Sequence, residues 1–114
     1  NVYLLGYRNY KYLPSYCAYF DVAWLPLIHN NYTKSMFPMK FFEYLAAGLP
    51  VVSTDLESIR EYGKLVAVSD DISKIKISII EALKNKNSNL KNRLSLAMEN
   101  TYQKRTKKML MELN

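Results

Sequence analysis

The sequence contains one cysteine and one histidine among its 114 residues, so few residues are available for several common kinds of site. A lone cysteine, Cys17, excludes an internal disulfide. It lies in an apolar helical stretch, where a free cysteine usually packs as a small hydrophobic side chain. The lone histidine, His29, argues against a structural zinc site, which needs several histidine or cysteine ligands. We therefore expect no bound metal and no cofactor.

Long hydrophobic runs are also lacking. The longest apolar stretch, residues 18–28, is interrupted by Asp21 and Pro26, whereas a membrane-spanning helix needs about 20 apolar residues. The first residues, NVYLL, do not form the basic region of a secretory signal. These features predict a cytoplasmic location. Because the sequence begins with Asn1 and not with Met, we expect the chain to be part of a longer protein.

The charge is positive, +6 in total, and residues 84–108 hold eight lysines and arginines against one acid, Glu99. This basic region has two interpretations that the sequence leaves open: a peripheral contact with the anionic inner membrane, or an ordinary solvated helix face. The ten tyrosines are scattered and not interleaved with the basic run. We therefore expect no nucleic-acid partner.

Hydrophobic periodicity predicts an α/β fold with a Rossmann-like parallel sheet and flanking helices. The expected strands are continuous apolar runs, as in parallel strands covered on both faces: residues 2–5, 22–25, 50–53 and 65–68. The last three should be adjacent, and residues 2–5 should stand apart. The expected helices cover residues 12–20, 38–47, 56–62, 71–83 and 90–113, and residues 27–37 are expected to form a loop.

Helix boundary signals support this assignment. Pro38 suits the start of a helix, Gly48 suits a helix C-cap, and Asp71 suits an N-cap. In a parallel sheet, ligands bind in the loops that follow the strands. The loop at residues 27–37 leads into the helix that begins near Pro38, whose free N–H groups favour anions. The sequence thus predicts an anion site at this helix start.

Lys40, Glu43 and Ala47 are spaced to share one face of that helix. A lysine in the first turn can reach a phosphate, and a carboxylate one turn further can accept two hydrogen bonds from a sugar diol. The same spacing also suits an ordinary surface ion pair. Spacing alone leaves both interpretations open.

The segment FPMKFFEYLAAGLPVVST, residues 37–54, resembles the donor-binding signature of a large family of retaining GT-B glycosyltransferases, known as group 1 or family 4. The matching positions are Pro38, Lys40, Glu43, Tyr44, Ala46, Ala47, Gly48, Pro50, Val51 and Val52. Gly6, Leu13-Pro14 and Phe20-Asp21-Val22 also fit, as does a P-x-x-x-N-x-x-T loop at Pro26, Asn30 and Thr33. The resemblance runs from residue 2 to residue 83.

The resemblance implies that the chain is the C-terminal, incomplete part of a GT-B donor-binding domain. Residues 1–87 would form a partial nucleotide-sugar-binding domain, and residues 88–114 a basic amphipathic helix packed on it. Glu43 would hold the ribose, and Lys40 with the helix start would hold the diphosphate. The expected donor-side residues are Thr33, Ser35, Phe37, Pro38, Met39, Lys40 and Glu43. The wider family has two glutamates eight positions apart, of which the first meets the donor sugar; Ser35 stands at that first position and Glu43 at the second.

The implied activity is transfer of a hexose from a nucleotide-diphosphate sugar to a glycan or lipid-linked acceptor, as in polysaccharide biosynthesis, without a metal. Catalytic residues are not identified in the sequence and are expected upstream of Asn1, in a missing N-terminal domain, so this chain alone should be inactive. Two alternatives remain. One is a non-catalytic or degenerate nucleotide-binding α/β module. The other is a GT-B nucleotide-sugar epimerase, whose sugar chemistry needs acids that this sequence lacks.

Overall fold

The computed structural model of the chain describes residues 1–113, and a three-stranded parallel sheet lies at its centre. The strands run in the spatial order β1-β2-β3, and the register places Val52 opposite both Trp24 and Ala67. Their bounds are Ala23–Leu25, Val51–Ser53 and Val66–Val68. The predicted α/β class is confirmed, as is the parallel pairing of the last three expected strands.

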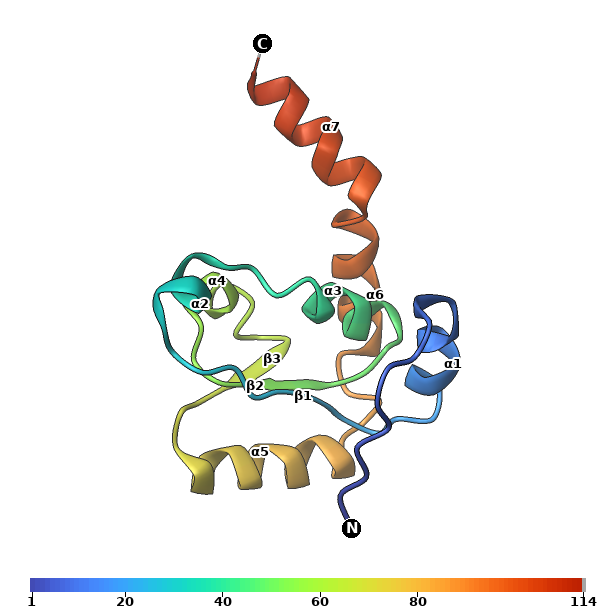
Figure 1. Cartoon of the computed structure of the whole chain (residues 1–114), viewed down its shortest axis with the longest axis vertical. Helices are drawn as coiled ribbons and strands as arrows, with labels where there is room; N and C mark the ends of the chain where they lie inside the picture. The colour runs from blue at the N-terminus through green and yellow to red at the C-terminus, as the bar shows by residue number, and fades with distance from the viewer. Residues whose placement is uncertain (114) are drawn as a thin grey trace.

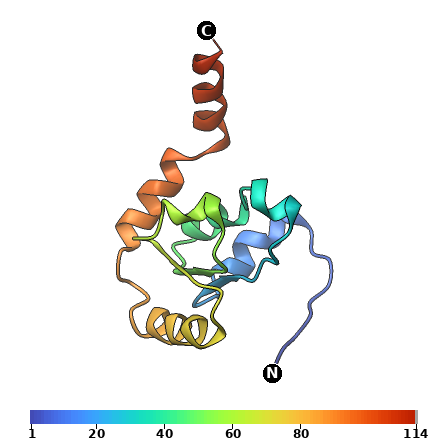
Figure 2. The same ribbon diagram turned by 90° about the vertical axis from the view of Figure 1, so that its left-hand side faces the viewer.

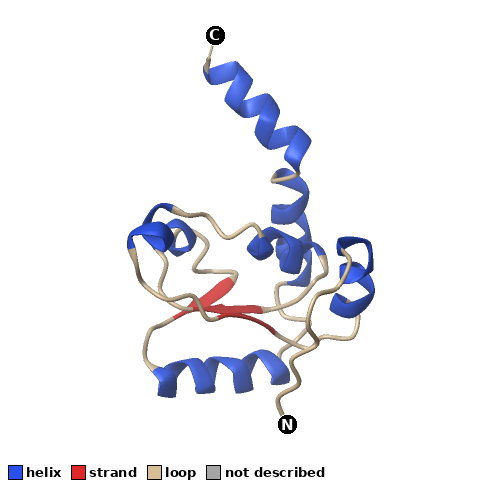
Figure 3. Cartoon of the chain, viewed as in Figure 1, coloured by secondary structure: helices blue, strands red, loops and turns tan. Residues whose placement is uncertain are grey.

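Helices cover both faces of this sheet. Helix α5 lies on one face, and helices α3 and α4 lie on the other, with α6 packed against α3 (Figures 1 and 3). The helical elements, in chain order, are η1 (Tyr10–Tyr12), α1 (Leu13–Cys17), α2 (Asn31–Ser35), α3 (Lys40–Ala46), α4 (Glu57–Arg60), α5 (Ile72–Lys84), α6 (Leu90–Glu99) and α7 (Tyr102–Glu112). The arrangement is a small three-layer α/β/α unit.

The core lies between the sheet and α3. Phe41 and Leu45 of α3 and Ile59 of α4 are completely buried, and they pack in one cluster with Leu25 and Val51 of the strands. The strands are too short to bury much area by themselves, so the aromatic side chains of α3 supply a large share of the apolar contact. Helix α3 is therefore fixed firmly to the sheet.

The prediction that residues 2–5 form a strand is wrong. They form an extended segment outside the sheet. Val2, Tyr3 and Leu4 are largely exposed. A strand is stable only when its N–H and C=O groups pair with a neighbouring strand, and among the described residues no strand lies beside this segment. The expected helix at residues 12–20 is also shorter and begins with η1.

Residues 27–37 are not a continuous loop, because they contain α2. Asn30 caps this helix: its side chain accepts a hydrogen bond from the Thr33 N–H, and the Thr33 hydroxyl accepts one from the Asn30 N–H, both at 2.9 Å. This reciprocal capping box stabilises a single helical turn without any apolar periodicity. Periodicity alone therefore does not reveal α2.

The tail is two helices and not the single helix expected at residues 90–113. Helix α6 ends at Glu99, with Asn100 as its C-cap, and the Thr101 side chain accepts a hydrogen bond from the Lys104 N–H to begin α7. Figures 1 and 2 show α7 projecting away from the body of the chain. Thr101 favours an N-cap over a helix interior, because its hydroxyl can satisfy a free N–H. The division of the chain into a domain of residues 1–87 and a C-terminal segment of residues 88–114 stays a prediction.

Arg93 attaches α6 to the body. Its side chain is buried, at 4% exposure, and its guanidinium donates to the carbonyls of Gly48, Lys86 and Ser88. Gly48 has a φ of +77°, and a Cβ there would lie 2.9 Å from Leu90 Cδ1. The predicted glycine C-cap is thus confirmed, and it also allows α6 to approach α3 closely.

Candidate functional site

Helix α3 has one face that packs in the core and one face that carries charged side chains. Phe41, Phe42 and Leu45 are buried against the core, whereas Lys40 and Glu43 remain partly exposed on the other face. The helical repeat produces this separation, because residues three and four apart share one face. The predicted alignment of Lys40, Glu43 and Ala47 is confirmed, since all three line one cavity.

Glu43 is the centre of a small hydrogen-bond network. The hydroxyl of Tyr10 in η1 donates to Glu43 Oε1 at 2.7 Å, and Lys40 Nζ donates to Oε2 at 2.6 Å. Lys40 Nζ also lies 5.3 Å from the centroid of the Tyr10 ring. The ion pair that spacing allowed is therefore formed, and a tyrosine from a distant part of the chain completes it.

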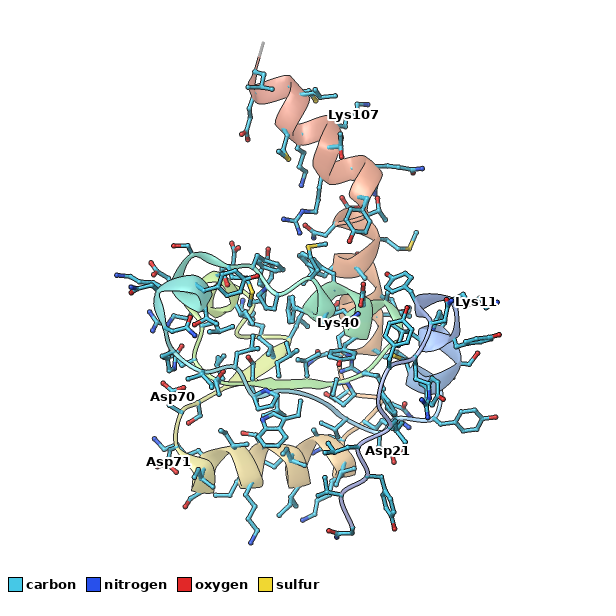
Figure 4. The ribbon with its side chains drawn as sticks, in the orientation of Figure 1. Lys11, Asp21, Lys40, Asp70, Asp71 and Lys107 are labelled. Atoms are coloured by element: carbon cyan, nitrogen blue, oxygen red, sulfur yellow. The ribbon has the colours of Figure 1, made fainter. Side chains whose placement is uncertain are left out.

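This network lies on the wall of a cavity of about 610 Å³ between α3 and the segment that leads into α1. Leu13, Pro14 and Cys17 of α1 contribute an apolar floor, and charged or polar groups from both walls border it. Figure 4 shows Lys40 on the α3 side and Lys11 on the far side of the α1 segment. A cavity of this size, mostly apolar with a few polar groups, is typical of small-molecule sites.

The second wall also has a fixed polar group. Arg8 Nε donates to the Tyr16 hydroxyl, and Arg8 Nη1 donates to the Tyr7 carbonyl, both at 2.9 Å. Arg8 and Tyr16 line the same cavity as Glu43. The cavity therefore presents a carboxylate and an ammonium on α3 and a guanidinium on the opposite segment.

Neighbouring charges set the protonation states of this network. The hydrogen bond to Glu43 raises the pKa of Tyr10 above its usual value, because a nearby carboxylate disfavours the phenolate. The hydrogen bond to Glu43 also raises the pKa of Lys40. At neutral pH, Tyr10 is thus a neutral donor and Lys40 a cation. Burial raises the pKa of the Cys17 thiol, which makes its thiolate scarce.

The other expected donor-side residues near the start of α3 pack elsewhere. The Phe37 ring lies 4.9 Å from that of Phe42, and Arg105 of α7 lies 5.3 Å from both rings. Arg105 Nη1 also contacts the Met39 sulfur at 3.7 Å. Pro38 is buried and its carbonyl accepts from the Phe41 N–H. Their donor roles stay predictions, and none of these side chains lines the cavity beside Glu43.

Thr33 and Ser35 lie on α2, away from that cavity. Thr33 is buried, and its hydroxyl donates to the Ile28 carbonyl at 2.6 Å. This contact uses the hydroxyl proton, and the capping box uses one of the two lone pairs. Ser35 is the exposed last residue of α2. The structure thus brings Lys40 and Glu43 together, and it separates them from Thr33 and Ser35.

A second cavity, of about 500 Å³, lies where the three strands end. His29 Nε2 lies 2.8 Å from Asp70 Oδ1, which also accepts from the Asp55 N–H at 2.9 Å. Arg60 donates to both oxygens of Asp55 at 2.7 and 3.0 Å. The hydrogen bond to His29 lowers the pKa of Asp70. Four of the charged or titratable groups here are therefore paired, His29 with Asp70 and Arg60 with Asp55.

Metal ligands do not gather in the described part of the chain: residues 1–113 contain no group of three or more histidine, cysteine, aspartate or glutamate side chains arranged to hold an ion. No helix within these residues is both long enough and apolar enough to cross a membrane.

Comparison with known proteins agrees with this geometry. The profile of the family described as "Glycosyl transferases group 1" matches residues 1–85, a range that includes both walls of the first cavity. The chain belongs to this family. It is 39% identical over 64 residues to TuaH of Bacillus subtilis (strain 168), which is named as a teichuronic acid biosynthesis glycosyltransferase. The match covers 56% of this chain and 16% of that protein. No solved structure matches.

Sequence reasoning about this glycosyltransferase chain identified Lys40 and Glu43 but not Tyr10, Arg8 or Tyr16. Arg8 and Tyr10 lie in a stretch without helical or strand periodicity, whereas Tyr16 lies in the helix expected at residues 12–20. The usable signal for Arg8 and Tyr10 is composition: YRNYKY, residues 7–12, follows Gly6 directly and combines aromatic and basic side chains. Only the folded chain shows that Tyr10 meets a residue 33 positions away.

Proposed function

We propose that this chain provides the donor site of a glycosyltransferase that moves a sugar from a nucleoside-diphosphate sugar to a glycan or lipid-linked acceptor. The observation that carries the proposal is the placement of Glu43 and Lys40, side by side, on the wall of the 610 Å³ cavity. The match to group 1 glycosyl transferases supports it. Because the chain spans 16% of the TuaH sequence, acceptor and catalytic groups are proposed to come from outside this chain.

The two side chains have different roles in this proposal. Glu43 accepts hydrogen bonds from the ribose hydroxyls, because a carboxylate is the strongest acceptor for a diol. Lys40, with the free backbone N–H groups at the helix start that follows Pro38 and includes Met39, binds the diphosphate. During transfer, negative charge develops on the departing diphosphate, and the Lys40 ammonium stabilises that charge. The apolar floor that Leu13 and Pro14 form suits the flat face of the nucleotide base.

The test is binding by Glu43→Gln, measured by isothermal titration calorimetry with UDP, GDP, CDP and ADP as probes. Gln keeps the shape and helix propensity of Glu but loses the charge. Affinity for the nucleotide that the unaltered chain prefers should fall by about ten- to a hundredfold, since charge-assisted hydrogen bonds contribute about 1.5–3 kcal/mol.

The matched control is Glu81→Gln, which changes an exposed acid of α5 on the opposite face of the sheet. Its affinity for the preferred nucleotide should equal that of the unaltered chain. If Glu43→Gln also binds with unchanged affinity, Glu43 is only half of a surface ion pair and the donor-site proposal is wrong.

A second function, a non-catalytic nucleotide-binding module, is favoured by one observation. Ser35 replaces the acid that the wider family places near the donor sugar, and it lies on α2, apart from the cavity with Glu43. Sugar release from a nucleotide-sugar donor, assayed in the longer protein, separates the two. Nucleotide binding with no transfer and no donor hydrolysis would favour the module.

We infer that α7 contacts an anionic membrane surface. At 100° per residue, Tyr102, Met109 and Leu113 share one side of α7, and Lys107 and Lys108 share the other. The three apolar side chains are 66–81% exposed, and Lys107 projects from the distal part of the helix (Figure 4). Such helices lie in the interface of acidic bilayers.

Vesicle flotation tests this contact. The chain should bind vesicles containing phosphatidylglycerol, and binding should fall at high salt because screening weakens the attraction. A Lys107→Glu, Lys108→Glu double variant should bind less. Equal binding to neutral phosphatidylcholine vesicles, or none to acidic ones, would make α7 an ordinary solvated helix.

A further inference from the structure

Glu43 retains unused hydrogen-bonding capacity. An ionised carboxylate offers about four lone-pair sites, two on each oxygen. Tyr10 occupies one site on Oε1, and Lys40 occupies one on Oε2. About one site therefore remains on each oxygen, beside the cavity that Glu43 lines. This is the acceptor pattern that two adjacent hydroxyl groups require.

The two protein donors hold the carboxylate from different directions. Lys40 reaches it along α3, three residues away, through a flexible four-carbon side chain. Tyr10 reaches it from η1, on the opposite wall, through a rigid ring with few rotatable bonds. Since Glu43 has three side-chain torsions, a lysine alone leaves the carboxylate plane poorly fixed. The Tyr10 contact removes that freedom.

We propose that Tyr10 is a positioning residue that makes this cavity selective for ribonucleotides, which have a cis-diol, over 2′-deoxyribonucleotides. The proposal rests on the proposed function, because it takes Glu43 as the ribose acceptor. A ribonucleotide fills both remaining acceptor sites when Tyr10 fixes the carboxylate plane. A 2′-deoxyribonucleotide has one hydroxyl at this edge and fills only one.

The protonation state of Tyr10 agrees with this role. Because Glu43 raises the pKa of Tyr10, the phenol keeps its proton at neutral pH and donates it to the carboxylate. A donor at this position leaves the negative charge of Glu43 in place for the ligand.

The experiment measures the affinity ratio between a ribonucleotide and its 2′-deoxy counterpart in the purified chain. UDP, GDP, CDP and ADP are titrated first, and the tightest is then compared with the matching 2′-deoxy diphosphate. The unaltered chain should prefer the ribonucleotide by about tenfold. Tyr10→Phe should bind the ribonucleotide about three- to fivefold more weakly and leave the affinity for the 2′-deoxy form unchanged.

Tyr12→Phe is the matched control, because Tyr12 lies in the same short helix and does not line the cavity. Its affinity ratio should equal that of the unaltered chain. Equal weakening of both nucleotides by Tyr10→Phe would make Tyr10 only a part of the cavity wall. Tighter ribonucleotide binding would make Tyr10 a competitor of the ligand. Either result overturns the proposal.

The proposed function fails in a different way. If Glu43→Gln reduces the preference for the ribonucleotide and Tyr10→Phe does not, Glu43 binds ribose and only the role of Tyr10 is wrong. If the unaltered chain binds none of the four diphosphates, or Glu43→Gln changes nothing, the donor site is wrong and the Tyr10 proposal falls with it.

Discussion

The two cavities of this chain differ in how their charged groups are used. At the ends of the strands, His29 is paired with Asp70 and Arg60 with both oxygens of Asp55. Beside α3, the charges of Lys40 and Glu43 are also paired, but they border a mostly apolar floor. The first arrangement links loops to one another, and the second places an acceptor next to a surface that suits a base.

The difference qualifies a general rule of α/β proteins. Ligands in parallel sheets usually bind where the strands end, and that rule points to the cavity with Asp55 and Asp70. Lys40, Glu43, Tyr44 and Ala47, on which the sequence resemblance rests, lie instead beside the α3 cavity. The topology therefore indicates at which edge of the sheet a ligand binds, and the chemistry of the lining side chains distinguishes between the two cavities. Three substitutions test this difference between the two cavities.

Arg93→Met should give the largest effect. It removes three part-buried hydrogen bonds, to the carbonyls of Gly48, Lys86 and Ser88, and hydrogen bonds from a charged donor contribute about 1.5–3 kcal/mol each before the structure relaxes. Burial already lowers the pKa of Arg93, so relief from burying a charge offsets part of the loss. We expect the free energy of unfolding in urea to fall by about 2–3 kcal/mol.

The control is Lys91→Met, which changes an exposed lysine on the same helix. Its free energy of unfolding should stay within about 0.5 kcal/mol of that of the unaltered chain. Because α6 packs on α3, Arg93→Met should also weaken nucleotide binding in the α3 cavity. Unchanged stability would mean that apolar contacts alone hold α6, and that the α3 cavity needs no support from the tail.

Lys40→Met should give an intermediate effect that depends on the ligand. Affinity for a nucleoside diphosphate should fall by about tenfold, because one cation to the diphosphate is lost, whereas affinity for the free nucleoside should change little. Arg60→Met removes a cation from the other cavity and should alter neither affinity. Calorimetry checks both variants. Equal losses for nucleoside and diphosphate in Lys40→Met would place the diphosphate elsewhere.

Asp70→Asn should give the smallest effect, and that effect should be lost in acid. The folded-state pKa of Asp70 lies below its ordinary value of 3.8, mainly because of the His29 contact and then the Asp55 N–H. A lowered carboxyl pKa stabilises the fold above the ordinary value, and the contribution is lost as pH falls through the folded value. Asp70 is exposed, so the effect is screened.

The measurement is the thermal midpoint between pH 7 and pH 2. The difference between the unaltered chain and Asp70→Asn should be present at pH 7, should begin to shrink near pH 3.8, and should disappear as the pH falls through the lower folded-state pKa of Asp70. A difference that persists at the lowest pH would show that Asn disturbs the loop and not the charge. Nucleotide affinity in the α3 cavity should be the same for both proteins at pH 7.

Part of this molecule followed from local sequence. The apolar runs that became β1, β2 and β3 could be identified because buried parallel strands need continuous apolar residues. The caps at Gly48 and Asp71 were equally local: Gly48 adopts a positive φ, and the Asp71 side chain accepts from the Ser73 and Lys74 N–H groups. Their cause lies within one helical turn.

The apolar residues of α5 recur with helical periodicity, but the structure buries only part of the face they form. Ile75 is buried, but Ile72 is 83% exposed and Leu83 is 51% exposed. A three-stranded sheet is too narrow to cover the whole apolar face of a helix of 13 residues. Periodicity thus gave the orientation of α5, and the width of the sheet decided how much of that face is buried.

The sequence by itself determined that Lys40 and Glu43 share a face of α3, because a helix of 3.6 residues per turn places them there whatever surrounds it. Tertiary structure decided what that face meets. The Tyr10 hydroxyl reaches Glu43 across 33 residues of chain, and Arg105 stacks on Phe37. Such contacts depend on how α1, α3 and α7 pack, and packing is set by the buried areas of the whole core and not by local spacing.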